Sequence, residues 1–256
     1  MNIFKNIFRT LALMFFALNI SAQSINVNET LFAEGNAAYE SGNIEKAIEL
    51  YEQISLSHTS AALLGNLGNA YFRNGDIARS ILNYERSLKL EPGNEDIRFN
   101  LGYVQKLTKD KLEEDESDQI SAFLRSVTSS YSADTWARSS ILFAFMLFSL
   151  LALVFILKKV SLKRIFLYSS FIMGTLFLSS IYFSYASKKM MGSQTHAIII
   201  EPKVDVKSEP NKDATDLFVL HEGSKVEILG RNKEWLHIQI PNGTKGWLTI
   251  DILEKI

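Results

Sequence analysis

Residues 61–94 read AALLGNLGNAYFRNGDIARSILNYERSLKLEPGN, and this stretch decides the fold of the N-terminal half. Apolar and aromatic residues recur in it at helical spacing on both sides of the triplet Asn74-Gly75-Asp76. Glycine accepts the positive φ that ends one helix, and aspartate caps the next. Pro92 cannot continue a helix and marks where the second one ends. The stretch therefore predicts two antiparallel helices joined by a short turn.

The flanking stretches repeat parts of this pattern. Residues 28–60 look like a preceding copy that is one residue shorter, and residues 95–112 echo the Asn-Leu-Gly triplet at Asn100, as a truncated third copy would. The earlier copy aligns on Gly35, Gly42, Ala47 and Tyr51. We expect residues 95–112 to form a helix that caps the array. Two repeats and a cap are fewer than the roughly three units that stability requires, so the module should be marginal unless the membrane or a partner supports it.

Residues 61–94 resemble the tetratricopeptide repeat, a 34-residue pair of antiparallel helices. The characteristic positions in register are Leu64, Leu67, Gly68, Tyr71, Ser80, Tyr84, Ser87 and Pro92. The resemblance implies that the first helices line a groove that holds an extended peptide or a partner's helix. The groove residues would be Phe32, Asn36, Tyr39, Asn69, Phe72 and Arg73. Two interpretations stay open: a clamp by Asn36, Asn69 and Arg73 on a partner's terminal carboxylate, and a solvated polar groove.

Two later stretches, residues 139–157 and 165–186, carry no charged residue. Both approach or exceed the roughly 20 apolar residues that a membrane-spanning helix needs. Buried helices of a soluble core are the alternative, but these would show polar positions at helical period. Residues 158–164 between them hold four basic residues, which predicts a cytoplasmic loop by the positive-inside rule.

Residues 1–22 have the pattern of a signal peptide: two basic residues, an apolar run and the small pair Ser21-Ala22. We expect cleavage after Ala22; the alternative is an uncleaved anchor, which the break at Asn19 disfavours. Export of the N-terminus places residues 23–136 and 187–256 on the same side. The sequence thus predicts an inner-membrane protein with two spans and both soluble modules in the periplasm.

Residues 113–136 connect the repeats to the first apolar stretch. Their acidic run predicts a solvated linker, since nothing forces its carboxylates to converge on a metal. Beyond it, apolar residues recur at helical spacing, as in a short interfacial helix on the membrane surface. These residues are Ile120, Phe123, Leu124, Val127 and Tyr131.

From residue 194 to residue 256 the sequence consists of short β-rich runs separated by turns, which indicates a small barrel. Residues 221–253 resemble the bacterial SH3-like domain in their Val-x-Ile-Leu strand, Asn-Gly hairpin and Gly-Trp-Leu close. Asn242-Gly243 suits a type I′ turn, in which both residues have positive φ. The functional interpretation of Trp235 and Trp247 is a groove for a peptide or cell-wall glycopeptide. The alternative is that one or both belong to the core.

Composition removes several classes of function. The 256 residues contain no cysteine, which excludes disulfides, thiolate zinc sites and cysteine nucleophiles. The sequence also shows no Gly-rich phosphate loop, no nucleophile with a paired base and no metal-spaced histidines, so we expect neither an enzyme nor a cofactor. The N-terminal module is acidic and would repel phosphate, so nucleic acid is not an expected partner.

The whole order of parts resembles the E-type proteins of the Bacteroides aerotolerance operon. That resemblance implies a role in envelope integrity or oxidative-stress tolerance beside membrane proteins with von Willebrand A domains and a MoxR-type ATPase. The expected fold class is a multidomain membrane protein with all-α tetratricopeptide repeats, a two-helix transmembrane hairpin and a C-terminal all-β SH3-like barrel. We expect a non-enzymatic, membrane-anchored adaptor for protein partners; the alternative is a sensor that binds peptidoglycan through the SH3-like domain.

Overall fold

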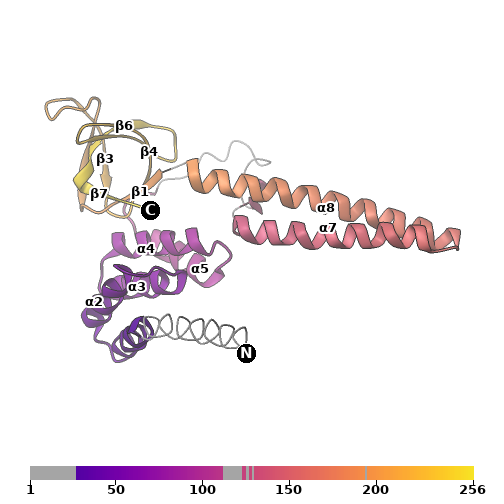
Figure 1. Ribbon diagram of the computed structural model, residues 1–256. Coiled ribbons are helices and arrows are strands. Elements are labelled where there is room, and N and C mark those ends of the chain that lie inside the picture. Colours follow the sequence, from indigo (N-terminus) through magenta and orange to yellow (C-terminus); the bar gives the residue numbers. More distant parts are fainter. Residues whose placement is uncertain (1–26, 112–122, 125–126, 129, 194) are drawn as a thin grey trace, which may run out of the picture.

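The computed structural model describes residues 27–111, 123–124, 127–128, 130–193 and 195–256. The expected signal peptide and residues 113–122, 125–126 and 129 of the expected linker lie outside the described residues. Residues 123–124 and 127–128, within the expected interfacial helix, are helical. The described chain forms a stack of short helices, a long two-helix hairpin and a curled β-sheet (Figure 1).

Short antiparallel helices form the N-terminal stack. They are a helix over residues 27–40, α2 (Ile44–Ser55), α3 (Ala61–Arg73), α4 (Ile77–Leu90) and α5 (Glu95–Gln105). Each of the last four begins after a polar side chain that accepts a hydrogen bond from the third helical N–H, which satisfies one free donor at the helix start. These caps are Asn43, Ser60, Asp76 and Asn94. Gly42 and Gly75 have φ near +83° and +84°, so the turns fall where the sequence predicts them.

Glycines and tyrosines hold the two helices of each repeat together. A Cβ atom on Gly35 would lie 2.6 Å from the ring of Tyr51, and one on Gly68 would lie 2.7 Å from the ring of Tyr84. Both tyrosines are almost fully buried. Only glycine permits this close contact, which explains the small and aromatic positions of the repeat pattern.

The expected capping helix, residues 95–112, is shorter than predicted. It packs Ile97, Leu101 and Val104 against α4 but ends at Gln105. The N–H of Thr108 bonds the carbonyl of Gln105, three residues back, and its hydroxyl also donates to that carbonyl. The helix is therefore closed by a tight turn, after which the chain moves toward the β-sheet.

The hairpin consists of α7 (Ala133–Ile156) and α8 (Val160–Ser193), which lie antiparallel (Figure 1). Both are long and apolar enough to cross a membrane. The basic loop predicted over residues 158–164 is shorter in the structure, because α8 begins at Val160 and includes Lys163 and Arg164. Residues 160–164 contain neither glycine nor proline, so nothing prevents the helix from starting before the apolar stretch.

Seven strands form the C-terminal sheet. They are β1 (Thr195–Ile199), β2 (Lys203–Lys207), β3 (Asp216–His221), β4 (Lys225–Asn232), β5 (Trp235–Gln239), β6 (Lys245–Thr249) and β7 (Leu253–Lys255). Their order is β3-β2-β6-β5-β4-β1-β7, with every neighbouring pair antiparallel. The sheet curls around one apolar core that includes Val206, Leu220 and Ile238 (Figure 1).

The turn between β5 and β6 differs from the prediction. Gly243 has a φ of +87°, but Asn242 does not have positive φ, so the turn is not type I′. Instead, Oδ1 of Asn242 accepts a hydrogen bond from the N–H of Thr244 at 3.0 Å. This side-chain hydrogen bond closes the turn, so that only Gly243 has to adopt a positive φ.

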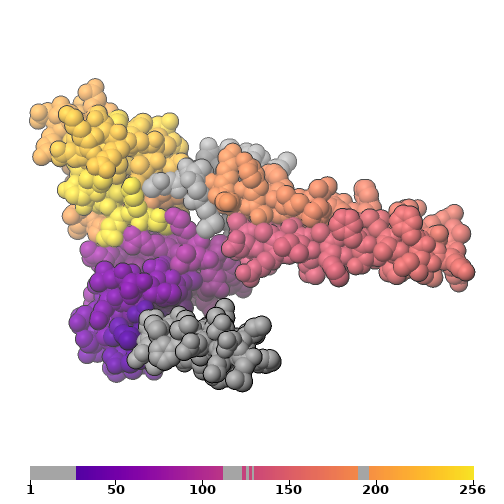
Figure 2. Space-filling model, viewed as in Figure 1, coloured from indigo at the N-terminus to yellow at the C-terminus, as the bar shows by residue number. Residues whose placement is uncertain are grey.

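Strand β1 is buried on both faces. Ala197 and Ile199 point into the core of the sheet, whereas Ile198 is fully buried among residues of α4 and α5. Figure 2 shows the β-sheet domain seated directly on the helical repeats. The two soluble parts therefore form one packed unit, a contact that the sequence did not predict.

Candidate functional site

A polar cluster joins the segment after α5 to the β-sheet domain. The carboxylate of Asp110 accepts hydrogen bonds from the N–H of His221 at 2.6 Å and from the hydroxyl of Ser224 at 2.7 Å. Its other oxygen lies 2.8 Å from Nδ1 of His221. Burial raises the pKa of Asp110, but these hydrogen bonds outweigh it and hold the pKa below its usual value. The charged form of Asp110 thus stabilises the contact between the domains.

Basic side chains of α4 make the second part of the contact. Arg86 Nε donates to the carbonyl of Lys255 at 3.1 Å, and Lys89 donates to the carbonyl of Ile256 at 3.0 Å. In the reverse direction, Lys225 of β4 lies 2.8 Å from Glu85 of α4. Helix α4 therefore binds the β1 and β7 edge of the sheet through both apolar and charged groups.

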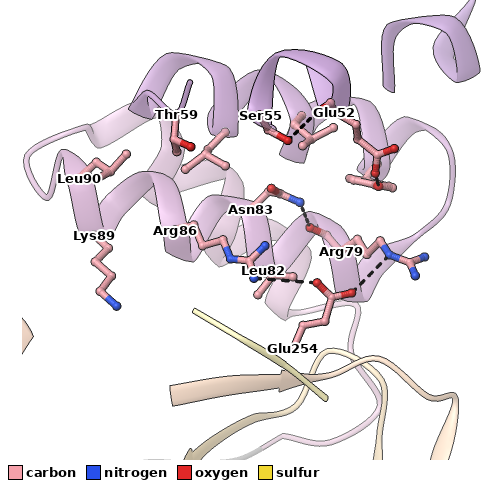
Figure 3. Close-up of a pocket in the computed structure, with 13 residues that line it drawn as sticks. Glu52, Ser55, Thr59, Arg79, Leu82, Asn83, Arg86, Lys89, Leu90 and Glu254 are labelled. Carbon is pink, nitrogen blue, oxygen red and sulfur yellow. Dashed lines mark hydrogen bonds and ion pairs between the residues drawn. The ribbon is translucent and has the colours of Figure 1, made fainter. Parts of the chain in front are cut away.

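A cavity of about 430 Å³ lies between α2, α3, α4 and β7. Figure 3 shows Glu254 of β7 reaching toward Arg79 and Arg86 of α4, from which it is 3.8 and 3.9 Å away. On the opposite wall, the hydroxyl of Tyr71 donates to Glu52. The charged groups of this cavity are used to join the domains, so we do not take it as the main binding site.

The asparagines predicted to line the groove on the first helices form a repeated pattern of hydrogen bonds. Asn36 Oδ1 accepts hydrogen bonds from the hydroxyl of Tyr51 at 2.7 Å and from Asn66 at 2.9 Å. One repeat later, Asn69 Oδ1 accepts the same pair of bonds. The donors there are the hydroxyl of Tyr84 at 2.6 Å and Asn100 at 3.1 Å. Each asparagine ties its own second helix to the first helix of the next repeat.

These bonds change the interpretation of the groove. Because the carbonyl oxygens of Asn36 and Asn69 are already used, neither residue is held in reserve for a carboxylate, and the clamp loses its main support. Burial raises the pKa of both Tyr51 and Tyr84 to about 12, so their hydroxyls stay protonated as donors. The first role of Asn36 and Asn69 is therefore to hold the helices of the repeats together.

The structure brings three of the predicted groove residues to one hollow. A cavity of about 290 Å³ is lined by Asn36, Tyr39 and Asn69, together with Glu40, Tyr51 and Asn66. Arg73 lies at its side, with its guanidinium 4.8 Å from the ring centre of Tyr39 and a hydrogen bond of 3.1 Å to the Tyr39 carbonyl. The hollow thus offers an aromatic ring, a cation and the exposed carboxylate of Glu40.

The other two predicted groove residues make separate contacts. Phe32 packs against Tyr51, with ring centres 5.9 Å apart, and also lines a second cavity of about 550 Å³ toward the start of the array. Phe72 meets Tyr103 of α5 edge to face at 5.8 Å. The six residues therefore follow one surface but do not converge on one point.

The two tryptophans of the β domain lie on its outer face. Trp235 and Trp247 are half-buried, and they alternate with the fully buried Leu236 and Leu248. Trp247 is paired in register with His237, and the two rings stack with centres 4.7 Å apart. Neither tryptophan is among the residues of the buried core cluster, and together with His237 they form an aromatic surface across β5 and β6.

The described residues contain no group of three or more His, Asp or Glu side chains that could hold a metal ion. Hydrogen bonding with Thr249 and the backbone lowers the pKa of Asp251 within the β-sheet domain. The other titratable groups with shifted pKa values in the described residues belong to the repeat packing or to the domain contact.

Two family comparisons agree with these geometries. The TPR repeat family matches residues 35–75 and 68–108, and the bacterial SH3 domain family matches residues 202–249. The chain therefore contains TPR repeats followed by two long apolar helices and a bacterial SH3 domain. No curated protein matches the chain significantly.

The domain contact was missed by the sequence reasoning, although one signal for it was present. Residues 197–200 read AIII, and such an unbroken apolar run is typical of a strand buried on both faces. Antiparallel strands with one solvated face alternate instead. Asp110 gave no signal, because it lies between Lys109 and Lys111 in a charged stretch that is typical of solvent-exposed chain.

Proposed function

We propose that this protein is a membrane-anchored adaptor that binds protein partners through the groove of its TPR repeats. The observation that carries the proposal is the docking of two recognition folds into one unit at one end of an apolar hairpin. TPR repeats imply protein partners in general. The hairpin supplies the anchor, since its apolar side chains are largely exposed and a bilayer would cover them.

The groove supports a protein ligand of extended or helical form. The hollow beside Tyr39, Arg73 and Glu40 presents both signs of charge next to an aromatic ring. Such a surface suits a peptide with mixed polar and apolar side chains better than a small metabolite. In the proposed topology, the basic residues near the α7–α8 turn face the cytoplasm and the soluble unit faces the periplasm.

The cellular role proposed for the adaptor is envelope integrity or oxidative-stress tolerance, with membrane proteins that carry von Willebrand A domains as partners. Its support is the order of parts, which resembles the E-type proteins of the Bacteroides aerotolerance operon.

Purification of the full-length protein in mild detergent tests the groove. Glu40→Lys reverses the exposed charge in the groove, while Glu45→Lys makes the same change on α2, outside the groove lining. We expect a partner that co-purifies with the native protein and with Glu45→Lys but not with Glu40→Lys. Equal recovery of every partner with both variants would contradict the proposal.

Cell-wall binding through the SH3 domain is a second candidate, favoured by the outward aromatic surface of Trp235 and Trp247. Full-length protein in detergent should then sediment with purified peptidoglycan. Trp235→Ala should reduce the sedimented fraction, and Leu229→Ala, an exposed apolar position on neighbouring β4, should not. Absence of sedimentation of the native protein would end this candidate.

A further inference from the structure

Helix α5 has the sequence of the first helix of a third repeat. Gly102 follows Gly68 by 34 residues, and Asn100 makes the same bond to Asn69 that Asn66 makes to Asn36. Phe99 precedes Gly102 by three residues, as Phe32 precedes Gly35 in the first repeat. Within the described residues, the array therefore ends in the first half of a repeat.

No described residue covers the surface that would receive the missing helix. A Cβ on Gly35 or Gly68 would collide with a tyrosine of the following helix, whereas a Cβ on Gly102 would meet no described atom within 4 Å. Phe32 contacts Tyr51, but Phe99 makes no ring contact within the described part of the chain and is 76% exposed. The glycine and phenylalanine that contact Tyr51 in the first repeat thus recur as Gly102 and Phe99, with no aromatic ring of the described chain packed against them.

The chain itself does not offer the missing tyrosine at the expected place. Counting 34 residues on from Tyr84 leads to Asp118, in the acidic stretch EEDESD. An aspartate cannot fill the apolar notch that a tyrosine ring fills in the first two repeats. This observation points to a helix from another protein.

The two complete repeats define the chemistry of that helix. Tyr51 and Tyr84 are each preceded by a small residue four positions earlier, Ala47 and Ser80, which permits close approach. On α5, Arg98 and Lys106 lie one turn before and one turn after Gly102, and neither forms an ion pair among the described residues. Acidic side chains on the incoming helix would complement them.

We propose that the face of α5 formed by Arg98, Phe99, Gly102 and Lys106 docks an acidic amphipathic helix of a partner protein, which completes the third repeat. The helix places a tyrosine against Gly102 and Phe99, and a small residue one turn earlier. This site is separate from the groove of Tyr39 and Glu40, so the two sites can be occupied together. Removing the open space at Gly102 should abolish docking without disturbing the repeats.

A peptide of this chain provides a direct probe. Residues 43–55, NIEKAIELYEQIS, form the helix that packs on Phe32 and Gly35, and they carry three glutamates and one lysine. A fluorescent copy of this peptide should bind full-length protein in detergent. Gly102→Leu should weaken binding by about tenfold or more, as expected for blocking a central aromatic anchor. A peptide with Tyr51→Ala should fail to bind; no binding of the native peptide, or binding that ignores Gly102→Leu, would overturn the proposal.

Photo-crosslinking in cells identifies the natural occupant. A photoreactive phenylalanine at position 99 should form an adduct with a partner's segment that contains a tyrosine in an acidic amphipathic helix, and Gly102→Leu should remove the adduct. The same reagent at Glu49, an exposed position on α2, serves as the control. Adducts only to lipid, to a second copy of the chain or to its own residues 107–131 would each contradict docking of a partner protein. Loss of groove partners in Glu40→Lys with the position-99 adduct intact would show that the two sites act independently.

Discussion

Asp110 and His221 are separated by 110 intervening residues in the sequence, yet the Asp110 carboxylate binds both the backbone N–H and the ring of His221. Both side chains are largely buried, at 15% and 16% exposed. This contact fixes the end of the TPR repeats to the turn between β3 and β4, and its charge makes it sensitive to substitution and to acid.

Replacing Asp110 by Asn should lower the free energy of unfolding by about 2–3 kcal/mol, because hydrogen bonds to a buried charged acceptor are lost or weakened. Chemical denaturation of the full-length protein in detergent measures this change. Asp96→Asn, at an exposed position on α5, should change the free energy by less than about 0.5 kcal/mol. A similar loss of unfolding free energy in both variants would show that the Asp110 contact contributes no more to stability than an exposed aspartate does.

The same contact should depend on pH in a defined direction. The pKa of Asp110 is lower in the folded protein than in the unfolded chain, so its contribution is complete above the usual value of about 4. It is lost as the pH falls through the lower, folded value. The difference in stability between the native protein and Asp110→Asn should therefore shrink below about pH 4. Denaturation curves at pH 3 and pH 5 measure it; an increase of the difference toward pH 3 would refute the assignment.

Replacing Gly223 by alanine should destabilise the protein for two reasons, backbone strain and side-chain collision, which can be measured separately. Its φ is +82°, and a Cβ there would lie 2.8 Å from Thr108 and 3.0 Å from Ile81 of α4. Gly243 has a similar φ of +87° but no neighbour within 4 Å. Gly243→Ala should thus cost only the backbone strain of about 1–2 kcal/mol, whereas Gly223→Ala should cost more. Thermal unfolding of both variants measures the two losses of stability. Equal losses would mean that Thr108 and Ile81 can shift to accommodate the added methyl group at little cost.

The glycine of the Gly-Trp-Leu motif in the SH3 domain, Gly246, is required by the close packing of β6. A Cβ at this position would lie 2.3 Å from the side chain of Val206, where β2 pairs with β6. Gly246→Ala should therefore destabilise the sheet by about 1–3 kcal/mol through overpacking. Gly230→Ala in β4 is the matched control, since no atom lies within 4 Å of its Cβ position. Tryptophan fluorescence during unfolding, measured with Trp136 of α7 replaced by Phe, follows this domain through Trp235 and Trp247. If Gly246→Ala left the stability unchanged, β2 would be able to move away from β6.

The repeat glycines should respond oppositely to the same substitution. Gly68→Ala forces a Cβ into the ring of Tyr84 and should destabilise the protein, while Gly102→Ala gains helix propensity of up to about 1 kcal/mol with no collision among the described residues. Melting temperatures of the two variants test this. A loss of stability in Gly102→Ala would mean that the open face of α5 is already covered.

Much of the fold could be predicted from the sequence, because its signals are local. The Asn-Gly-Asp turn, the helix caps and the glycine and aromatic spacing act within one repeat, and the apolar stretches identify α7 and α8 by composition. The arrangement of domains could not be predicted in this way. It depends on Ile198, Asp110 and Gly223, whose partners are far away in the sequence, so no spacing rule connects them.

The sequence predicted where the candidate groove residues lie better than it predicted which hydrogen bonds they make. The sequence placed Asn36, Tyr39 and Asn69 on one surface, and they line one hollow. It could not show that both asparagine carbonyls are used by Tyr51 and Tyr84, because such bonds depend on side-chain geometry between helices. The outward position of Trp235 followed from strand alternation only once its neighbour Leu236 was known to be buried.

The junction of hairpin and sheet sets how far the protein can reach. Helix α8 ends at Ser193 and β1 begins at Thr195, so one residue separates the proposed anchor from the strand that is packed between the sheet and α4. A long flexible tether would let the SH3 domain search a volume that grows with tether length. Because the connection between α8 and β1 is so short, the SH3 domain can reach no farther than the dimensions of the folded unit itself. In the proposed membrane-anchored arrangement, any ligand of Trp235 or of the groove therefore has to reach the membrane surface, where both surfaces are presented from a fixed position.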